Sequence, residues 1–266
     1  MKKIFFFSDV HLGLQDKQQE KEKEQRLLSF LSHVQQHGDQ LFIMGDLFDY
    51  WFEYKSVIPR GFHHVLSKLA NLVESGIAVH YVAGNHDFWL KDFFPKELGI
   101  PVYKEPFGMT LHGKKFFFHH GDGLALNDTG YRILKKILRS PVSIFLYSLF
   151  HPDWTAPIAR GSSKTSRQYT GHKDYGETDG MVKYADKKIA EGYDIVIMGH
   201  RHTPMEKSIG EGMYLNLGDW ITHNTYAEFD GKTISLKVWN GKKANTAAPR
   251  RTKTESKTAP KKRSRK

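Results

Sequence analysis

The chain has 266 residues, of which 39% are hydrophobic and 13% aromatic, so it can bury a substantial core in one or two domains. It contains no cysteine, which excludes disulfides and thiolate metal sites and leaves His and oxygen donors as the available ligands. The formal net charge is +11, but residues 242–266 hold eleven Lys or Arg and one acid, so the rest of the chain is close to neutral.

Apolar runs and amphipathic segments alternate in the first half of the chain. Strands are predicted at Ile4–Phe7, Leu41–Met44 and Val79–Ala83. Helices are predicted between them, over residues 17–37 and over Phe62–Val73, the second ending before Gly76. This alternation is typical of parallel strands covered by helices.

The second half is predicted to add more strands and an insertion. Met109–Leu111 and Lys115–Phe118 predict a hairpin, and residues 124–180 interrupt the alternation like an inserted helical cap. A helix over Lys183–Glu191 is followed by predicted strands at Ile195–Met198, Met213–Leu217, Ala227–Asp230 and Thr233–Trp239. We predict one α/β sandwich domain over residues 1–241 and a basic tail over residues 242–266 with too few apolar residues to order itself.

A cluster of His, Asp or Asn follows each of five predicted strands. The clusters are Asp9-Val10-His11, Gly45-Asp46, Gly84-Asn85-His86-Asp87, His119-His120-Gly121-Asp122 and Gly199-His200-Arg201-His202. Side chains at positions i and i+2 of a strand point the same way, so Asp9 and His11 are expected to face one site, and likewise His200 and His202. His119 is expected to point away from His120.

The clusters hold enough donors for two divalent ions. We predict that Asp46 bridges the ions and that the remaining ligands are Asp9, His11 and His202 for one ion and Asn85, His120 and His200 for the other. A single such residue is more often a cap or a surface residue, so the joint pattern carries the prediction. This mixture of imidazole and oxygen donors suits Mn, Fe or Zn in an open catalytic site.

These motifs, spread over residues 4–220, resemble those of the calcineurin-like metallophosphoesterase superfamily. The resemblance implies a four-layer αββα sandwich and two divalent ions, usually Mn, that activate a water for attack on phosphorus. It also implies that His86 donates a hydrogen bond or a proton near the leaving group and that Asp87 orients His86.

A closer resemblance is to the UDP-2,3-diacylglucosamine hydrolases, through the segments 45–51, 87–88 and 120–131. It implies a lipid-linked nucleotide sugar substrate of lipid A biosynthesis, with UMP and a diacylglucosamine 1-phosphate as products. It further implies a cytoplasmic protein, peripheral at the inner-membrane surface, whose cap contacts the substrate through Asp128, Tyr131, Arg160, Ser163, Lys164 and Arg167. The chain departs from that group at His86, where its members usually carry Arg, and at Phe52-Glu53-Tyr54.

The two predicted cap helices have apolar faces that allow two interpretations. The first helix carries Ile133, Leu134, Ile137 and Leu138 on one side, and a second apolar run follows Pro141. Such faces can enclose two acyl chains or can pack on the core, and periodicity alone favours packing.

Two other functions remain open at this point. The basic tail is compatible with a phosphodiesterase or nuclease that acts on nucleic acid, although the nearly neutral remainder of the chain argues against it. The tail is also compatible with a solubilising role. A metal-bound scaffold without catalysis would have no need of His86.

Overall fold

The computed structural model describes residues 2–126, 129–152, 154 and 177–241, with only the backbone described at residues 177–179. The predicted basic tail lies outside these residues. So do Asp128, Arg160, Ser163, Lys164 and Arg167 from the predicted substrate contacts.

The first sheet contains six strands in the order β11-β10-β1-β2-β3-β4. Its centre is formed by β1 (Lys3–Phe7), β2 (Gly38–Ile43), β3 (Ala78–Val82) and β4 (Val102–Tyr103), which run parallel. On the other side of β1, β10 (Thr225–Phe229) pairs antiparallel with it, with Ile4 opposite Phe229, and β11 (Ile234–Val238) completes the edge. The predicted parallel strands are thus confirmed.

The second sheet contains five strands in the order β5-β6-β7-β9-β8. The predicted hairpin is formed by β5 (Phe107–Leu111) and β6 (Lys114–Phe118). The next strand, β7 (Ile195–Met198), runs parallel to β6 and to β9 (Gly212–Asn216). The edge strand β8 (Met205–Ile209) was not predicted, because its sequence alternates little and its middle residues are exposed.

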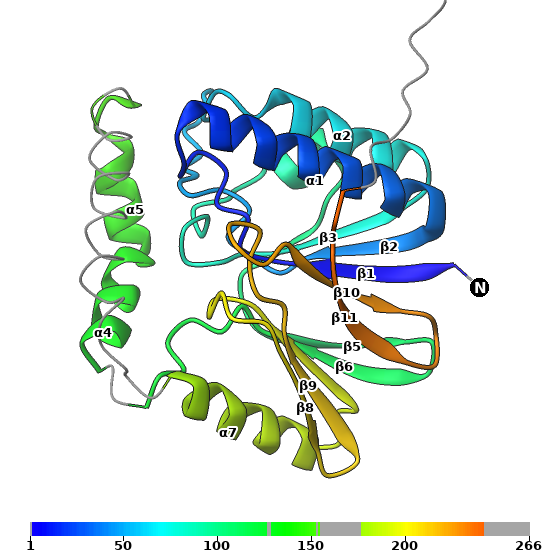
Figure 1. Cartoon of the computed structure of the whole chain (residues 1–266). Helices are drawn as coiled ribbons and strands as arrows, with labels where there is room; N and C mark the ends of the chain where they lie inside the picture. The colour runs from blue at the N-terminus through cyan, green and yellow to red at the C-terminus, as the bar shows by residue number, and fades with distance from the viewer. Residues whose placement is uncertain (1, 127–128, 153, 155–176, 242–266) are drawn as a thin grey trace, which may run out of the picture.

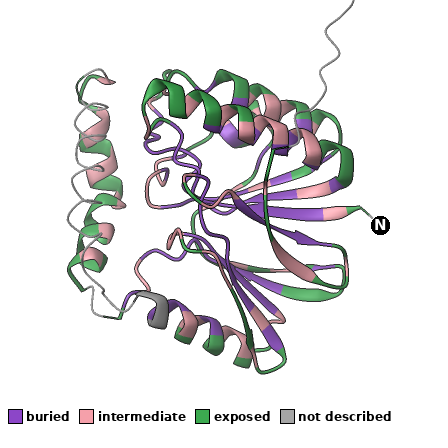
Figure 2. Cartoon of the chain, viewed as in Figure 1, coloured by how far each residue is buried: buried purple, intermediate pink, exposed green. Residues whose placement is uncertain are grey.

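The two sheets pack face to face between layers of helices (Figure 1), which confirms the predicted four-layer sandwich. Successive side chains of each strand point to opposite faces of its sheet, so each strand contributes both to the core between the sheets and to the core under the helices. Ile4 and Phe6 point between the sheets, where they meet Phe116 and Phe118. Phe5 and Phe7 point the other way, toward helix α1 (Lys17–His37) and helix α2 (His63–Glu74). Figure 2 shows that the buried residues follow these sheet faces.

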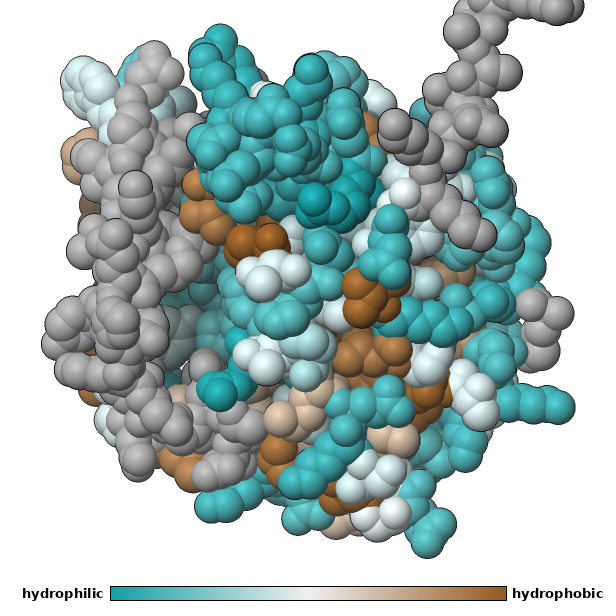
Figure 3. All heavy atoms as spheres, in the orientation of Figure 1, coloured by the Kyte–Doolittle hydropathy of each residue, from teal (hydrophilic) through white to brown (hydrophobic). Residues whose placement is uncertain are grey.

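Helix α1 illustrates how the sequence sets the outer layer. Asp16 caps its N-terminus, accepting hydrogen bonds from the backbone N–H groups of Gln18 and Gln19 at 3.0 Å each. Its inner face buries Leu27, Phe30, Leu31 and Val34. The outer face is hydrophilic (Figure 3), as its many charged residues require.

On the far side of the sandwich, helix α7 (Glu177–Ala190) covers the second sheet. Met181 and Ala185 pack with Phe117 and Val196. The helix therefore begins inside the range 124–180 that we assigned to the cap, and the last residues of that range belong to the sandwich. Among the described helices, none combines the length and apolar character that a membrane span needs.

The described part of the cap consists of α4 (Thr129–Leu138) and α5 (Pro141–Ser148), beside the carboxyl ends of β1, β2 and β3 (Figure 1). Neither helix contains a buried residue, and Ile133 and Ile137 are 56% and 55% exposed. The expectation that the apolar faces pack on the core was therefore wrong for α4, whereas in α5 the ring of Tyr147 packs against Phe52 and Trp89. Polar contacts attach α4 instead, as described below for Lys135 and Arg139.

Candidate metal centre

The seven predicted metal ligands lie just beyond the carboxyl ends of five strands. Asp9 and His11 follow β1, Asp46 follows β2 and Asn85 follows β3 in the first sheet. His120 follows β6, and His200 and His202 follow β7 in the second sheet. Because both sheets end at the same side of the sandwich, residues almost 200 positions apart converge there.

The first ligand group consists of Asp9, His11 and His202, whose donor atoms lie close together. The two imidazole Nε2 atoms of His11 and His202 are 3.2 Å apart. The Oδ1 atom of Asp9 lies 3.8 Å from His11 Nε2 and 3.4 Å from His202 Nε2. Three donor atoms around one small space are the arrangement that a single cation requires.

The second ligand group consists of Asp46, His120 and His200. The Oδ2 atom of Asp46 is 3.3 Å from His120 Nε2, which in turn lies 3.1 Å from the amide oxygen of Asn85. The same Asp46 oxygen is 3.7 Å from His11 Nε2 of the first group. Asp46 therefore stands between the two groups, in the position of a bridging carboxylate.

The chemistry of these donors fits divalent cations. The carboxylates of Asp9 and Asp46 are buried, and among the described residues Asp9 Oδ1 receives no hydrogen bond. Leaving a buried acceptor unsatisfied costs about 1–3 kcal/mol, so a buried carboxylate oxygen of this kind calls for a cation. Imidazole and carboxylate groups together are ligands that suit a first-row transition metal.

Backbone strain is concentrated at the same residues. Seven described non-glycine residues have positive φ, and five of them are the predicted ligands Asp9, His11, Asp46, His200 and His202. Each left-handed residue costs on the order of 1–3 kcal/mol, so such strain is typical of functional sites. The i, i+2 pairs therefore reach the ligand groups through left-handed turns, and not through the strand alternation from which we predicted their direction.

Two glycines permit the strands to approach one another at the site. A Cβ atom at Gly84 would collide with the carboxylate of Asp46. A Cβ atom at Gly199 would collide with the side chains of Ser8 and Asp9. Any larger residue at either position would push the ligand loops apart.

A second layer of acceptors faces the Nδ1 atoms of three ligand imidazoles. Asp49 Oδ1 lies 3.3 Å from His11 Nδ1, and Asp219 Oδ2 lies 3.5 Å from His202 Nδ1. The carbonyl oxygen of Met44 accepts from His120 Nδ1 at 2.8 Å. Such partners fix the tautomer and the orientation of a ligating imidazole. Our sequence reasoning missed Asp49 and Asp219, although each follows an apolar run closely.

The electrostatics of the centre are dominated by these carboxylates. Burial lowers the pKa of His11, but Asp49, Asp9 and Asp46 outweigh burial and raise it to about 9. Burial also lowers the pKa of His120, which the charge of Asp46 raises to about 10. For Asp219, burial favours a higher pKa, but hydrogen bonds from His202 and from two backbone N–H groups lower it to about 2. The local potential is strongly negative, which attracts cations.

His86 lies beside the centre but has a different partner from the one we predicted. Its Nδ1 atom is 3.0 Å from the carbonyl oxygen of Asp49 and 3.7 Å from the carboxylate of that residue. Its ring also lies against His11, with centroids 4.7 Å apart. His86, His11 and Asp46 further meet the spacing of a possible metal group.

Asp87 does not orient His86, and that expectation was wrong. Its carboxylate is fully buried and accepts from the N–H groups of Leu47 and Gly84 at 2.8 Å each, and from the hydroxyl of Tyr81 at 2.5 Å. The local turn sends consecutive side chains in opposite directions, so Asp87 ties together the loops after β2 and β3. Burial raises its pKa to about 6.

Glu53, in the segment that departs from the resembled group, also has a structural role. The side chain is buried and accepts from the indole N–H of Trp51 at 3.0 Å. Its other oxygen accepts from the backbone N–H groups of Asp92 and Phe93, at the start of α3 (Phe93–Glu97). Glu53 thus connects its own loop to the start of α3.

Asp122 joins the cap to the centre. Its Oδ2 atom lies 2.8 Å from Lys135 Nζ and 2.7 Å from the Arg139 guanidinium. Arg139 also donates to the carbonyl oxygen of Gly84 at 3.3 Å.

Tyr131, from the predicted substrate contacts, lies in α4 and is partly buried. His119 points away from the ligand groups, and its ring contacts Tyr184.

Comparison with known proteins gives the same family as the motifs. The calcineurin-like phosphoesterase family model matches residues 2–204. A protein named UDP-2,3-diacylglucosamine hydrolase from Porphyromonas gingivalis is 37% identical over 88% of this chain and 96% of its own length. Proteins of the same name from Nitrosococcus oceani and Pseudomonas fluorescens are 29% and 26% identical, covering 75% and 92% of this chain and 78% and 99% of their own lengths.

Proposed function

This chain belongs to the calcineurin-like phosphoesterase family, and we propose that it hydrolyses the pyrophosphate bond of UDP-2,3-diacylglucosamine. The products would be UMP and 2,3-diacylglucosamine 1-phosphate. The substrate assignment is supported by three relatives of that name, each of which aligns with at least three quarters of this chain.

The observation that carries the reaction type is the position of Asp46 between the two ligand groups. We propose Asp9, His11, Asp46 and His202 as ligands of one ion, and Asp46, Asn85, His120 and His200 as ligands of the other. When bound, two divalent ions, for which we propose Mn, would lower the pKa of a water and polarise the phosphate oxygens. The bridging carboxylate would hold both ions at one reaction centre.

His86 is proposed as the general acid. With Nδ1 bonded to the Asp49 carbonyl oxygen, its protonated ring would present the Nε2 proton to the departing phosphate oxygen. Transfer of that proton would neutralise the charge that develops as the pyrophosphate P–O bond breaks. Asp49 would position both this ring and that of His11, the role that we had predicted for Asp87.

We further propose that the substrate binds under the cap. We retain Asp128, Tyr131, Arg160, Ser163, Lys164 and Arg167 as proposed substrate contacts, because Arg and Lys suit phosphate recognition and the resemblance covers these positions. Lys135 and Arg139 are already held toward the centre by Asp122.

We also propose that the protein works as a peripheral protein at the cytoplasmic face of the inner membrane. The exposed apolar side chains of the cap support this proposal, since Val142, Phe145 and Leu149 in and after α5 are each more than 60% exposed. An amphipathic surface of this kind binds the boundary between headgroups and acyl chains.

A substrate comparison tests the proposed function. Protein loaded with Mn is assayed on UDP-2,3-diacylglucosamine, on bis-p-nitrophenyl phosphate and on single-stranded DNA. The lipid-linked nucleotide is expected to give the highest kcat/KM by at least two orders of magnitude. A preference for DNA would replace this proposal with the nuclease alternative.

A further inference from the structure

Helix α4 turns its basic face, and not its apolar face, toward the sandwich. Arg132, Lys135, Lys136 and Arg139 recur at the helical spacing and line a cavity of about 600 Å³. Ile133, Leu134 and Ile137 on the other face are at least half exposed. On the basic face, Lys135 and Arg139 are half-buried against Asp122, whereas Arg132 and Lys136 are exposed.

The cavity carries a clear excess of positive charge. Besides the four cations of α4 it is lined by Lys104, while its carboxylates are those of Glu105 and Asp122. Asp122 is engaged by Lys135 and Arg139. Within the described part of the chain, neither Lys104 nor Lys136 forms an ion pair. Lys104 and Lys136 can therefore pair with the negative charges of a bound ligand.

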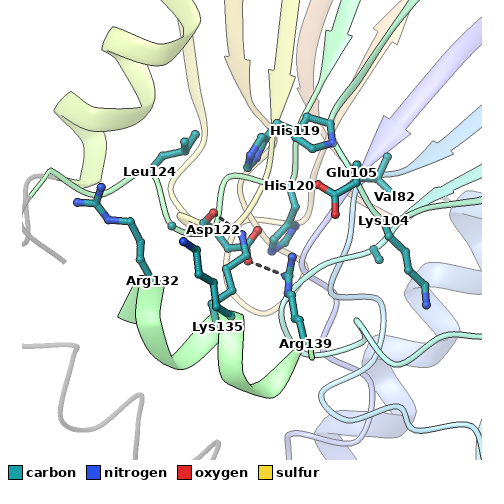
Figure 4. A pocket seen from close by; sticks show the side chains of 14 residues that line it. Val82, Lys104, Glu105, His119, His120, Asp122, Leu124, Arg132, Lys135 and Arg139 are labelled. Atoms are coloured by element: carbon teal, nitrogen blue, oxygen red, sulfur yellow. Dashed lines mark hydrogen bonds and ion pairs between the residues drawn. The ribbon is translucent and has the colours of Figure 1, made fainter. Parts of the chain in front are cut away.

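The cavity opens directly onto the proposed metal centre. His120 belongs both to the second ligand group and to the cavity wall. In Figure 4, Arg132, Lys135 and Arg139 rise from α4 on one side, His119 and His120 lie on the sheet side, and Glu105 and Lys104 lie at one end. An anionic ligand bound here would thus reach the ion held by His120 with one of its phosphate oxygens.

The polarity of the cavity selects one half of the proposed substrate. Hydrolysis divides that substrate into a polar nucleoside phosphate and a sugar phosphate with two acyl chains. Acyl chains would exclude water from Lys104 and Lys136 without supplying an anionic partner, whereas a nucleotide supplies phosphate oxygens and polar base edges. The volume lies within the usual range of ligand pockets, about 300–1,000 Å³.

We propose that the cavity between α4 and the ends of β3 and β6 binds the nucleoside monophosphate half of the substrate, with Lys104 and Lys136 as phosphate-binding and charge-compensating residues. This inference rests on the proposed function. It assigns the two faces of α4 to the two halves of the substrate. The basic face binds the nucleotide, and the apolar face contacts the acylated half.

Binding of UMP tests the proposal without turnover. UMP is titrated by calorimetry into the full Mn-loaded chain, into Lys104→Gln/Lys136→Gln, and into the control Lys187→Gln. Both lysines of the double variant are exposed, so the fold should tolerate the change. Lys187 is also an exposed lysine, in the last turn of α7, before the start of β7 and away from the centre. The Mn content of each protein reports whether the metal centre is intact.

The double variant is expected to bind UMP at least tenfold more weakly than wild type, with normal Mn content, while the control binds UMP normally. Its KM for UDP-2,3-diacylglucosamine should rise in parallel. An unchanged UMP affinity would overturn the proposal. An equal loss of affinity for UMP and for 2,3-diacylglucosamine 1-phosphate would overturn the nucleotide assignment. Failure of the wild-type protein to hydrolyse the lipid substrate would instead reject the proposed function, at any measured affinity for UMP.

Discussion

Asp219 presents its Oδ2 atom to the Nδ1 atom of His202 at 3.5 Å. The other oxygen of Asp219 accepts from the backbone N–H groups of Thr222 and His223 at 2.9 Å each, so the carboxylate is held in the turn after β9. The following residue, Trp220, donates its backbone N–H to the carbonyl oxygen of Asp9 at 3.0 Å. One turn thus positions two members of the first ligand group.

Removal of this carboxylate should weaken metal binding. In Asp219→Ala we expect about tenfold to hundredfold weaker Mn binding, because the imidazole of His202 loses its orienting partner. Titration of Mn followed by electron paramagnetic resonance measures the affinity directly. Asp230→Ala is the matched control, since Asp230 also accepts from two backbone N–H groups of a turn but faces no imidazole. Equal Mn affinity in the two variants would contradict the positioning role.

Asp46 and His202 should differ in the number of ions that their loss removes. Asp46 lies between both ligand groups, whereas His202 belongs to one. Asp46→Ala is therefore expected to retain fewer than one Mn per chain, and His202→Ala about one. Elemental analysis after dialysis gives both values. If Asp46→Ala kept one ion as firmly as His202→Ala does, Asp46 would not be a bridge.

His86 should affect turnover more than metal content. Loss of a general acid typically costs about 10²–10⁴-fold in rate, so His86→Ala is expected to reduce kcat within that range while Mn content stays near that of wild type. Single-turnover rates and metal analysis on the same sample separate the two roles. A proportional loss of both would make His86 a ligand, as its spacing to His11 and Asp46 allows.

Removal of metal should reduce both activity and stability. Without cations, the buried carboxylates of Asp9 and Asp46 face each other's charge in the interior, and a ligand that binds only the folded state stabilises it. Treatment with a chelator is expected to abolish hydrolysis and to lower the Tm by several degrees, and added Mn should restore both. Full activity in thoroughly chelated protein would refute a metal mechanism.

The exposed apolar side chains of the cap should promote membrane binding. Phe145→Ser/Leu149→Ser is expected to bind vesicles with anionic lipid about a hundredfold more weakly than wild type in a sedimentation assay, because burial of each side chain is worth about 1.5–3 kcal/mol. Val238→Ser, at an exposed apolar position of β11, is the control. Removal of residues 242–266 in parallel shows how much binding depends on the basic tail.

The amino-acid sequence by itself determined the layers of the sandwich and the identity of the candidate ligands. Alternating apolar residues such as Phe5 and Phe6 necessarily point to opposite faces of a strand, and this two-residue period is local. The polar clusters after β1 and β7 were equally visible, since carboxylates and imidazoles at the ends of apolar runs are chemically distinctive.

Only the tertiary structure decided which side chains face one another. The partner of His86 is Asp49 and not the adjacent Asp87, because the turn after β3 directs neighbouring side chains apart. The contact of Asp219 with His202 joins two loops of the second sheet, and the basic face of α4 turns inward because Asp122 engages Lys135 and Arg139. Local periodicity specifies elements and their faces, whereas these pairings depend on how separate loops pack, which no local pattern encodes.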